Sequence, residues 1–165
     1  MTKQQRLQQY GITTNEQAIQ VIKLVCDILG NGGKNNAHEM LIRTAMSESQ
    51  MGNYPDSSKD YGESIFQFDE IAFYDTIERT RAKDVNLVHK HFGFWLEDMQ
   101  YSDLRNNIVF ACVMARLKYK LVPASFPEDF EGQWKYYKKY WNTESGKATR
   151  EHFYKMNGVS LESEK

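Results

Sequence analysis

NAHEMLIRTAMSESQMG, residues 36–52, has the pattern of an amphipathic helix that ends in a turn. Ala37, Leu41, Ala45 and Glu48 are spaced at i, i+4, i+8 and i+11, which places them on one helix face. Because this face is otherwise apolar, it is expected to pack on a core, and Glu48 extends it at its C-terminal end. The stretch therefore predicts an α-helix that carries a carboxyl group toward the interior of a helical protein.

The ends of this helix carry start and stop signals. Asn36, followed three residues later by Glu39, has the form of a capping box with Asn in place of Ser or Thr. Glu39 and Arg43 lie off the apolar stripe and are expected to face solvent. The helix is expected to end before three residues that break helices, Gly52, Asn53 and Pro55.

Glu48 is the residue of this helix that suggests chemistry. A charged carboxylate that is buried without a partner is costly, so a buried carboxyl group tends to stay protonated at neutral pH. A protonated carboxylic acid that faces a cleft is what the cleavage of a glycosidic bond requires. The alternative is that Glu48 lies at the helix edge and reaches water. Spacing alone favours neither interpretation.

The residues around and after Glu48 resemble a known motif. Glu48-Ser49, followed across a loop by Ile65-Phe66-Gln67, is similar to the motif of lytic transglycosylases and goose-type lysozymes in the lysozyme-like superfamily. In that motif a catalytic Glu and a Ser precede a Gly-Leu-Met-Gln element at about this distance. Three later segments extend the resemblance: residues 106–117 resemble the long helix behind the family's cleft, Tyr140-Trp141-Asn142 with Gly146 resembles its Tyr-Asn-Ala-Gly stretch, and residues 131–149 resemble phage-encoded members.

The chain also departs from the family pattern. Ser64 stands where the family usually has Gly, and Thr143-Glu144-Ser145 replaces the Ala-Gly that follows the Asn. These departures affect the details of substrate binding more than the role that the resemblance gives to Glu48.

The resemblance implies a peptidoglycan-degrading enzyme that cleaves the β-1,4 bond between N-acetylmuramic acid and N-acetylglucosamine. Glu48 would be the catalytic acid, and no cofactor is implied. The residues expected to contact or position the glycan are Ser49, Ser64, Phe66, Gln67, Tyr140, Trp141 and Asn142.

Three versions of this function differ in their chemistry. A lytic transglycosylase needs only Glu48, because the C6 hydroxyl of the sugar is the nucleophile, and the resemblance favours this version. A lysozyme-type hydrolase (muramidase) usually needs a second carboxylate. Its candidates are Asp56, Asp60, Glu63 and Asp69. The third version is a non-catalytic module that keeps the fold to bind glycan or to build a virion or secretion apparatus.

The rest of the chain is expected to be helical as well. At 165 residues it is long enough for one domain, 1–158, with a frayed tail, 159–165. The expected fold class is mainly α, and the resemblance makes it lysozyme-like, with a short loop or β-ribbon near residues 52–66. Apolar periodicity predicts the other helices at 14–29, 69–81, 85–96, 103–121, 128–140 and 147–156.

Cysteines and histidines indicate no cross-link and no metal site. Cys26 and Cys112 lie in apolar helical contexts and are expected to be buried free thiols, with a disulfide as the alternative. The four histidines have no arrangement with the spacing of metal ligands that other ligands support, so no metal ion is expected.

Charge and hydropathy exclude several partners. The net charge of −1 and one short basic segment, 134–155, make nucleic acid a poor fit. No stretch approaches the ~20 apolar residues of a membrane span, and residues 1–9 lack the apolar core of a signal peptide. The expected partner is the peptidoglycan glycan strand. The enzyme is expected to reach the bacterial wall through a phage particle, a holin lesion or a secretion system, whose components are further candidate partners.

The charges are unevenly distributed along the chain. Residues 48–70 are acidic, whereas the segment 134–155 is rich in lysine and aromatic residues. These segments are either two solvated faces that attract each other or an acidic catalytic loop opposite a basic wall. In the second case the wall would meet the carboxylates of peptidoglycan stem peptides.

Overall fold

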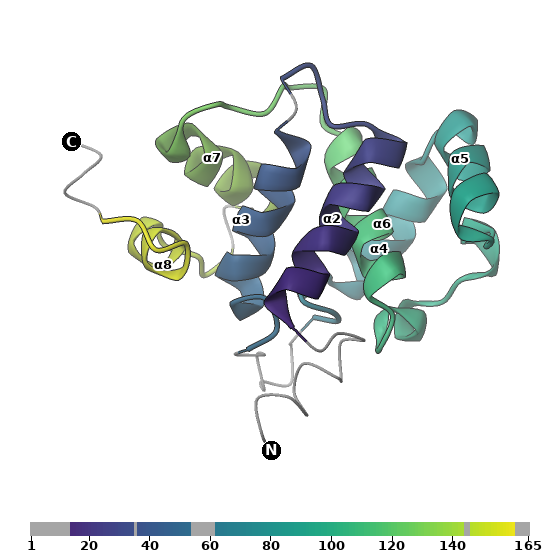
Figure 1. Ribbon diagram of the computed structural model, residues 1–165, viewed down its shortest axis with the longest axis horizontal. Coiled ribbons are helices and arrows are strands. Elements are labelled where there is room, and N and C mark those ends of the chain that lie inside the picture. Colours follow the sequence, from purple (N-terminus) through teal and green to yellow (C-terminus); the bar gives the residue numbers. More distant parts are fainter. Residues whose placement is uncertain (1–13, 35, 54–61, 144–145, 161–165) are drawn as a thin grey trace.

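The computed structural model describes residues 14–34, 36–53, 62–143 and 146–160, and it confirms a mainly α fold (Figure 1). Two short 3-10 helices lie at Leu96–Asp98 and Tyr101–Leu104, and a π-helical turn, Lys138–Asn142, continues the helix before it. The α-helices are α2 (Asn15–Leu29), α3 (Ala37–Ser49), α4 (Glu70–Arg79), α5 (Ala82–Phe92), α6 (Ile108–Lys120), α7 (Phe130–Tyr137) and α8 (Arg150–Met156). Within the described residues no helix is long and apolar enough to span a membrane.

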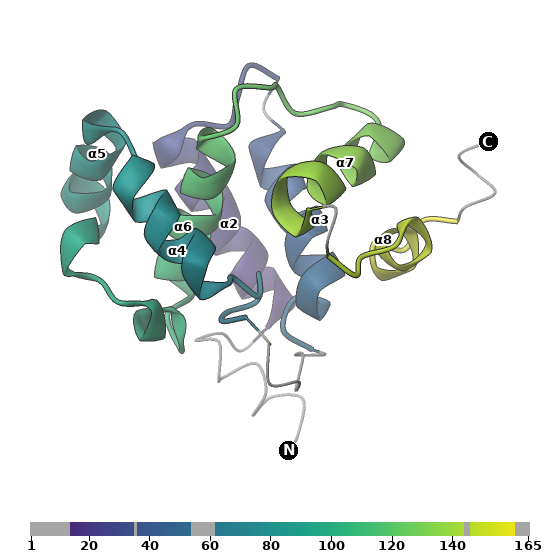
Figure 2. The same cartoon turned by 180° about the vertical axis from the view of Figure 1, so that it is seen from behind.

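Helix α6 is the centre of the structure. Nearly every residue from Ile108 to Leu117 is buried, on all sides of the helix, which is typical of a helix that other elements surround. Helices α2 and α3 lie side by side on one side of α6, and α4 covers the opposite side (Figures 1 and 2). Helices α7 and α8 pack mainly on α3, and α7 also reaches α6, where the ring centroids of Tyr136 and Tyr119 lie 5.9 Å apart.

Helix α6 begins later than the apolar pattern predicts. Residues 101–104 form a separate 3-10 helix, and Asn106 has a φ of 59°, which a right-handed helix cannot contain. Asn107 then caps α6, because its side-chain oxygen accepts a hydrogen bond from the Phe110 amide at 3.0 Å. The predicted helix 103–121 is therefore split at this turn.

The C-terminal end of α2 depends on cations from α6. Helix α2 has no basic residue in its last turn. Arg116 donates from Nε to the Gly30 carbonyl at 2.6 Å, and Lys120 donates from Nζ to the Leu29 carbonyl at 2.7 Å. Both groups satisfy carbonyls that a helix end leaves unpaired and compensate the negative end of its dipole. Lys120 also pairs with Asp84 of α5 at 2.7 Å, which joins a third helix to this cluster.

The N-terminal end of α3 differs from the predicted capping box. Asn36 occupies the N-cap position but makes no side-chain cap; its Nδ2 instead donates to the carbonyl oxygens of Pro127 (3.0 Å) and Phe126 (3.5 Å). The capping-box prediction is therefore wrong. The Asn36 side chain is used to bind a segment about 90 residues away in the sequence, a contact that no local pattern indicates.

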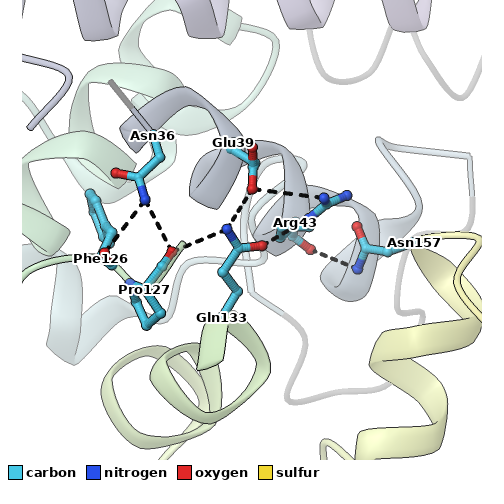
Figure 3. A network of polar contacts seen from close by, with 7 residues as sticks. All are labelled: Asn36, Glu39, Arg43, Phe126, Pro127, Gln133 and Asn157. Atoms are coloured by element: carbon cyan, nitrogen blue, oxygen red, sulfur yellow. Dashed lines mark hydrogen bonds and ion pairs between the residues drawn. The ribbon is translucent and has the colours of Figure 1, made fainter. Parts of the chain in front are cut away.

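Glu39 and Arg43 were expected to face solvent, but their side chains are only 40% and 25% exposed and take part in a contact between helices. They form an ion pair at 3.9 Å, and both contact Gln133 of α7, which is fully buried (Figure 3). Gln133 accepts from Arg43 Nε at 3.2 Å and donates from Nε2 to Glu39 and to the Pro127 carbonyl. We call these three side chains the α3–α7 clasp, because they join the two helices through a buried amide.

Three smaller expectations have mixed outcomes. Within 62–68 the expected ribbon is a single antiparallel bridge between Glu63 and Phe68, and residues 54–61 lie outside the described part. Cys26 and Cys112 are buried free thiols, as predicted. Val159, which was expected in a frayed tail, is half-buried, and its amide donates to the Tyr154 carbonyl at 2.9 Å. Residues 161–165 lie outside the described part.

The clasp generates a test of stability. Gln133→Ala should lower the free energy of unfolding by about 2 kcal/mol or more, because it leaves Glu39 and Arg43 without their buried partner and opens a cavity in place of the buried amide. Urea denaturation of both proteins measures the difference. Gln20→Ala, on the exposed face of α2, is the matched control and should change stability by less than about 0.5 kcal/mol. Equal effects of the two substitutions would show that the clasp contributes nothing.

Candidate active site

Glu48 lies in the last turn of α3 and is half-buried. The hydroxyl of Tyr137, at the end of α7, donates a hydrogen bond to Glu48 Oε1 at 2.8 Å. Since Tyr137 is almost completely buried, its ring is held in place by packing, and its hydroxyl is a donor in a defined position. The carboxyl group is thus oriented from the neighbouring helix.

The Tyr137 hydroxyl is a weaker acid than an ordinary phenol, because its pKa is raised. Burial raises the pKa of Tyr137 far above its ordinary value, and the negative charge of Glu48 raises it further. The raised pKa favours the protonated hydroxyl, which is the form that donates the hydrogen bond to Glu48.

Ser49, the residue after Glu48, connects α3 to the turn 62–68. Its buried hydroxyl donates to the Ile65 carbonyl at 2.6 Å and accepts from the Gly52 amide at 2.8 Å. One side chain therefore joins the end of the helix, the residues that follow it and the turn. In this structure Ser49 positions the backbone next to Glu48.

The turn 62–68 has a strained backbone. Ser64 and Gln67 have φ angles of 74° and 49°, in the left-handed region where a non-glycine residue costs roughly 1–2 kcal/mol. A Cβ atom on Gly62 would lie 2.1 Å from the Gln67 carbonyl oxygen, so only glycine fits there. Strain of this kind persists where the surroundings enforce it, and it is frequent at functional sites.

The Gln67 side chain closes the turn 62–68. Its Nε2 donates to the Ser64 carbonyl at 2.7 Å, and within the described residues its buried Oε1 has no hydrogen-bond partner. An acceptor left unpaired at this depth is costly. The unpaired Gln67 carbonyl is therefore a second cost that this turn carries, beside its strained backbone.

Trp141 and Phe66 are core residues in this structure. Trp141 is 6% exposed and packs against Tyr119, Phe68 and Phe66 with ring centroids 5.1, 5.2 and 6.2 Å away. Phe66 is fully buried. Their rings form the inner wall of the site rather than a face open to a sugar.

Tyr140 and Asn142 lie closer to the surface. Tyr140 is half-buried, with its ring against Tyr136. Asn142 Oδ1 accepts from Lys138 Nζ at 2.7 Å and from the Ala148 amide at 3.3 Å. Among the seven expected glycan contacts, the side chains that are not fully enclosed are Gln67, Tyr140 and Asn142.

Lys118 of α6 brings a cation to the same place. Its Nζ lies 3.9 Å from the ring centroid of Trp141 and 5.4 Å from that of Phe68, and the described residues provide it with no hydrogen-bond acceptor. Burial lowers the pKa of Lys118 to about 8, while the charges of Asp69 and Glu48 oppose this shift. The ammonium group is thus charged at neutral pH and within electrostatic range of Glu48.

The candidates for a second carboxylate have other partners where the structure describes them. Glu63 is buried, and its Oε1 accepts from Arg105 Nε at 2.8 Å. Asp69 is the N-cap of α4 and accepts from the Ala72 amide at 2.8 Å. Asp56 and Asp60 lie outside the described residues.

Sequence reasoning did not identify Tyr137 or Lys118. Tyr137 belongs to the aromatic segment 134–141, but the resemblance directs attention to Tyr140 and Trp141. Lys118 is a charged residue near the end of a predicted core helix, which usually indicates a solvated position. The sequence offers one signal for Lys118: it stands directly between two large residues, Leu117 and Tyr119, that belong to the predicted core helix. The structure shows that both of these neighbours are buried.

Comparison of the chain with protein-family models, with curated proteins and with solved structures finds no match. The described residues contain no group of three or more His, Cys, Asp or Glu side chains that could hold a metal ion. A function for the site is therefore argued from the geometry of Glu48 and its neighbours.

The burial of Lys118 generates a test that does not depend on function. Its folded-state pKa of about 8 lies below the value near 10.5 of an unfolded chain. Between these pH values the unfolded chain binds more protons, so the contribution of Lys118 to stability rises with pH. The free energy of unfolding of the wild type, relative to Lys118→Met, should therefore increase from pH 8 to pH 10 in urea titrations.

Lys83→Met, at an exposed position of α5, is the matched control. The free energy of unfolding of Lys83→Met should depend on pH in the same way as that of the wild type. A pH-independent difference between the wild type and Lys118→Met would show that the Lys118 ammonium is solvated.

Proposed function

We propose that this protein cleaves the β-1,4 bond between N-acetylmuramic acid and N-acetylglucosamine in peptidoglycan, as a lytic transglycosylase with Glu48 as its single catalytic carboxyl group. The observation that carries the proposal is the hydrogen bond from Tyr137 to Glu48 Oε1, beside a strained turn that Ser49 fastens to the same helix. A carboxyl group oriented by a buried donor fits the requirement of a positioned general acid. The resemblance of Glu48-Ser49 and Ile65-Phe66-Gln67 to the transglycosylase motif supports the same assignment.

The proposed reaction needs one carboxyl group and no water. Glu48 in its protonated form donates its proton to the glycosidic oxygen, and the bond from that oxygen to C1 of the muramic acid residue breaks. The resulting cation at C1 is attacked by the oxygen of the C6 hydroxyl of the same sugar. Glu48, now a carboxylate, takes the proton of that hydroxyl, which forms a 1,6-anhydro ring and restores the acid.

The neighbouring residues act on this cycle through Glu48. Tyr137 holds Oε1 in both protonation states, so the carboxyl group need not reorient between the two proton transfers. The Lys118 ammonium offsets the negative charge that appears on Glu48 after the first transfer. Because the pKa of Lys118 is about 8, this assistance is lost as pH rises above that value.

Two described acids are poorly suited to activate water. Glu63 is paired with Arg105, and Asp69 caps α4. An acid with such a partner gives up a structural contact if it takes up a proton. This favours the transglycosylase over the hydrolase, which needs a base across the cleft.

The direct test of Glu48 is the substitution Glu48→Gln. The amide keeps the shape of the side chain but cannot deliver a proton, so the release of soluble fragments from purified peptidoglycan should fall by about 10²–10⁴-fold. Glu70→Gln, an exposed residue at the start of α4, is the matched control and should keep wild-type activity. Circular dichroism checks that both variants are folded. Glu48 is the wrong residue if the Gln variant keeps more than about a tenth of the activity.

The single-carboxylate mechanism makes a separate prediction for the four candidates for a second carboxylate. Asp56→Asn, Asp60→Asn, Glu63→Gln and Asp69→Asn should each keep activity within about tenfold, or about 1.4 kcal/mol in barrier. A base that activates water would instead lose several orders of magnitude when neutralised. The rates are measured per folded molecule, since Glu63→Gln also breaks the pair with Arg105. One severe loss among the four would favour the muramidase.

A further inference from the structure

A cavity of about 570 Å³ lies at the other end of α3 from Glu48. It is bounded by the connection between α2 and α3, the C-terminal end of α6, residues 122–128 and Tyr136 of α7. Asn36 lines this cavity and Glu48 lies twelve positions further along α3, a separation of roughly 18 Å at 1.5 Å per residue. The cavity is therefore distinct from the candidate active site.

Arg116 is a buried cation in the wall of this cavity. It is 5% exposed, and its Nε donates to the Gly30 carbonyl. Within the described residues its two terminal nitrogens have no hydrogen bond and no ion pair. Burial lowers the pKa of the guanidinium, and the charge of Asp84, which is not within ion-pair distance, opposes this shift only in part.

The other charged groups of the wall do not neutralise Arg116. Lys120 is paired with Asp84, and Lys34 at the rim is paired with Glu128 at 3.3 Å, with both partners mostly in solvent. Glu128 is the one acidic residue among the lining residues, against three basic ones. The cavity therefore carries an excess of positive charge, and the buried part of it is Arg116.

The wall also has an apolar part, which includes Pro123, Phe126 and Tyr136, and hydrogen bonds hold it in place. Tyr136 donates to the Ala124 carbonyl at 2.7 Å, and Asn36 holds the carbonyls of Phe126 and Pro127 (Figure 3). The guanidinium of Arg116 lies 5.5 Å from the ring centroid of Phe126. The volume is within the range of small-molecule sites, about 300–1,000 Å³, and the wall has both ring faces and a planar cation.

We propose that this cavity is a binding site for a small organic oxyanion, a carboxylate or phosphate attached to an apolar or aromatic body. The two terminal nitrogens of Arg116 bind the oxyanion, since a guanidinium matches both carboxylate and phosphate oxygens. The body of the ligand packs between Phe126, Pro123 and Tyr136. Such a ligand supplies the directly bonded anion that Arg116 lacks within the described residues.

Titration of the full chain with phenyl phosphate, benzoate and phenol, followed by calorimetry, tests the proposal. At least one of the two oxyanions should bind saturably, and phenol at least about tenfold more weakly, because it lacks the charged partner of Arg116. The oxyanion that binds more tightly shows whether the ligand carries a carboxylate or a phosphate group.

Ser125→Trp should block the cavity from its exposed lip and weaken oxyanion binding at least tenfold. It avoids the risk that a change of Arg116 itself destabilises the end of α2. Ser102→Trp, at an exposed position outside the cavity, is the matched control and should bind as the wild type does. The proposal is overturned if neither oxyanion binds, if phenol binds equally well, or if Ser125→Trp and Ser102→Trp have the same affinity.

Discussion

The contact between α3 and α7 is the constraint on which the candidate site depends. Gln133 and Tyr137 are one turn apart on α7, so both side chains point to the same neighbouring helix. Gln133 binds Glu39 and Arg43 near the start of α3, and Tyr137 binds Glu48 near its end. Two polar side chains therefore fix how the helices align, and the alignment sets where the Glu48 carboxyl group points.

The position of α3 between other helices keeps most of the core apolar and the candidate site polar. Helix α6 is buried on nearly all sides, and α3 packs against α6, α7 and α8. On its α7 side, an amide and a phenol satisfy polar side chains of α3. On its α6 side, the hydroxyls of Thr44 and Tyr119 are hydrogen-bonded at 2.7 Å. Only Lys118 brings charge from α6 to the site, and the rings of Trp141 and Phe68 lie against it. Its lowered pKa is the consequence of that burial.

The sequence predicted what local rules control. The apolar stripe of α3, its end before Gly52 and the mainly α fold follow from periodicity and from residues that break helices, and the structure agrees with them. The apolar stripe also identified Glu48 as unusual, because a carboxyl group on an apolar face can be recognised from the spacing within one helix. Buried free thiols at Cys26 and Cys112 followed from their apolar surroundings.

The contacts that sequence reasoning missed all join residues far apart in the chain. Asn36 and Glu39 have the spacing of a capping box, yet both side chains bind groups about 90 residues away. An i, i+3 pattern cannot distinguish a cap from a tertiary contact, because both use the same polar side chains. Tyr137 and Lys118 were missed for the same reason: their roles depend on which helix end packs against them.

The central claim is that Glu48 donates a proton to the glycosidic oxygen, takes one from the C6 hydroxyl of the muramic acid residue, and that no water takes part. Digestion of purified peptidoglycan in water enriched in ¹⁸O, followed by mass spectrometry of the fragments, tests it most directly. The account predicts fragments with 1,6-anhydro ends and no incorporated label. Reducing ends that carry ¹⁸O would contradict the transglycosylase mechanism, and intact glycan strands would contradict the assignment of any cleavage to this site.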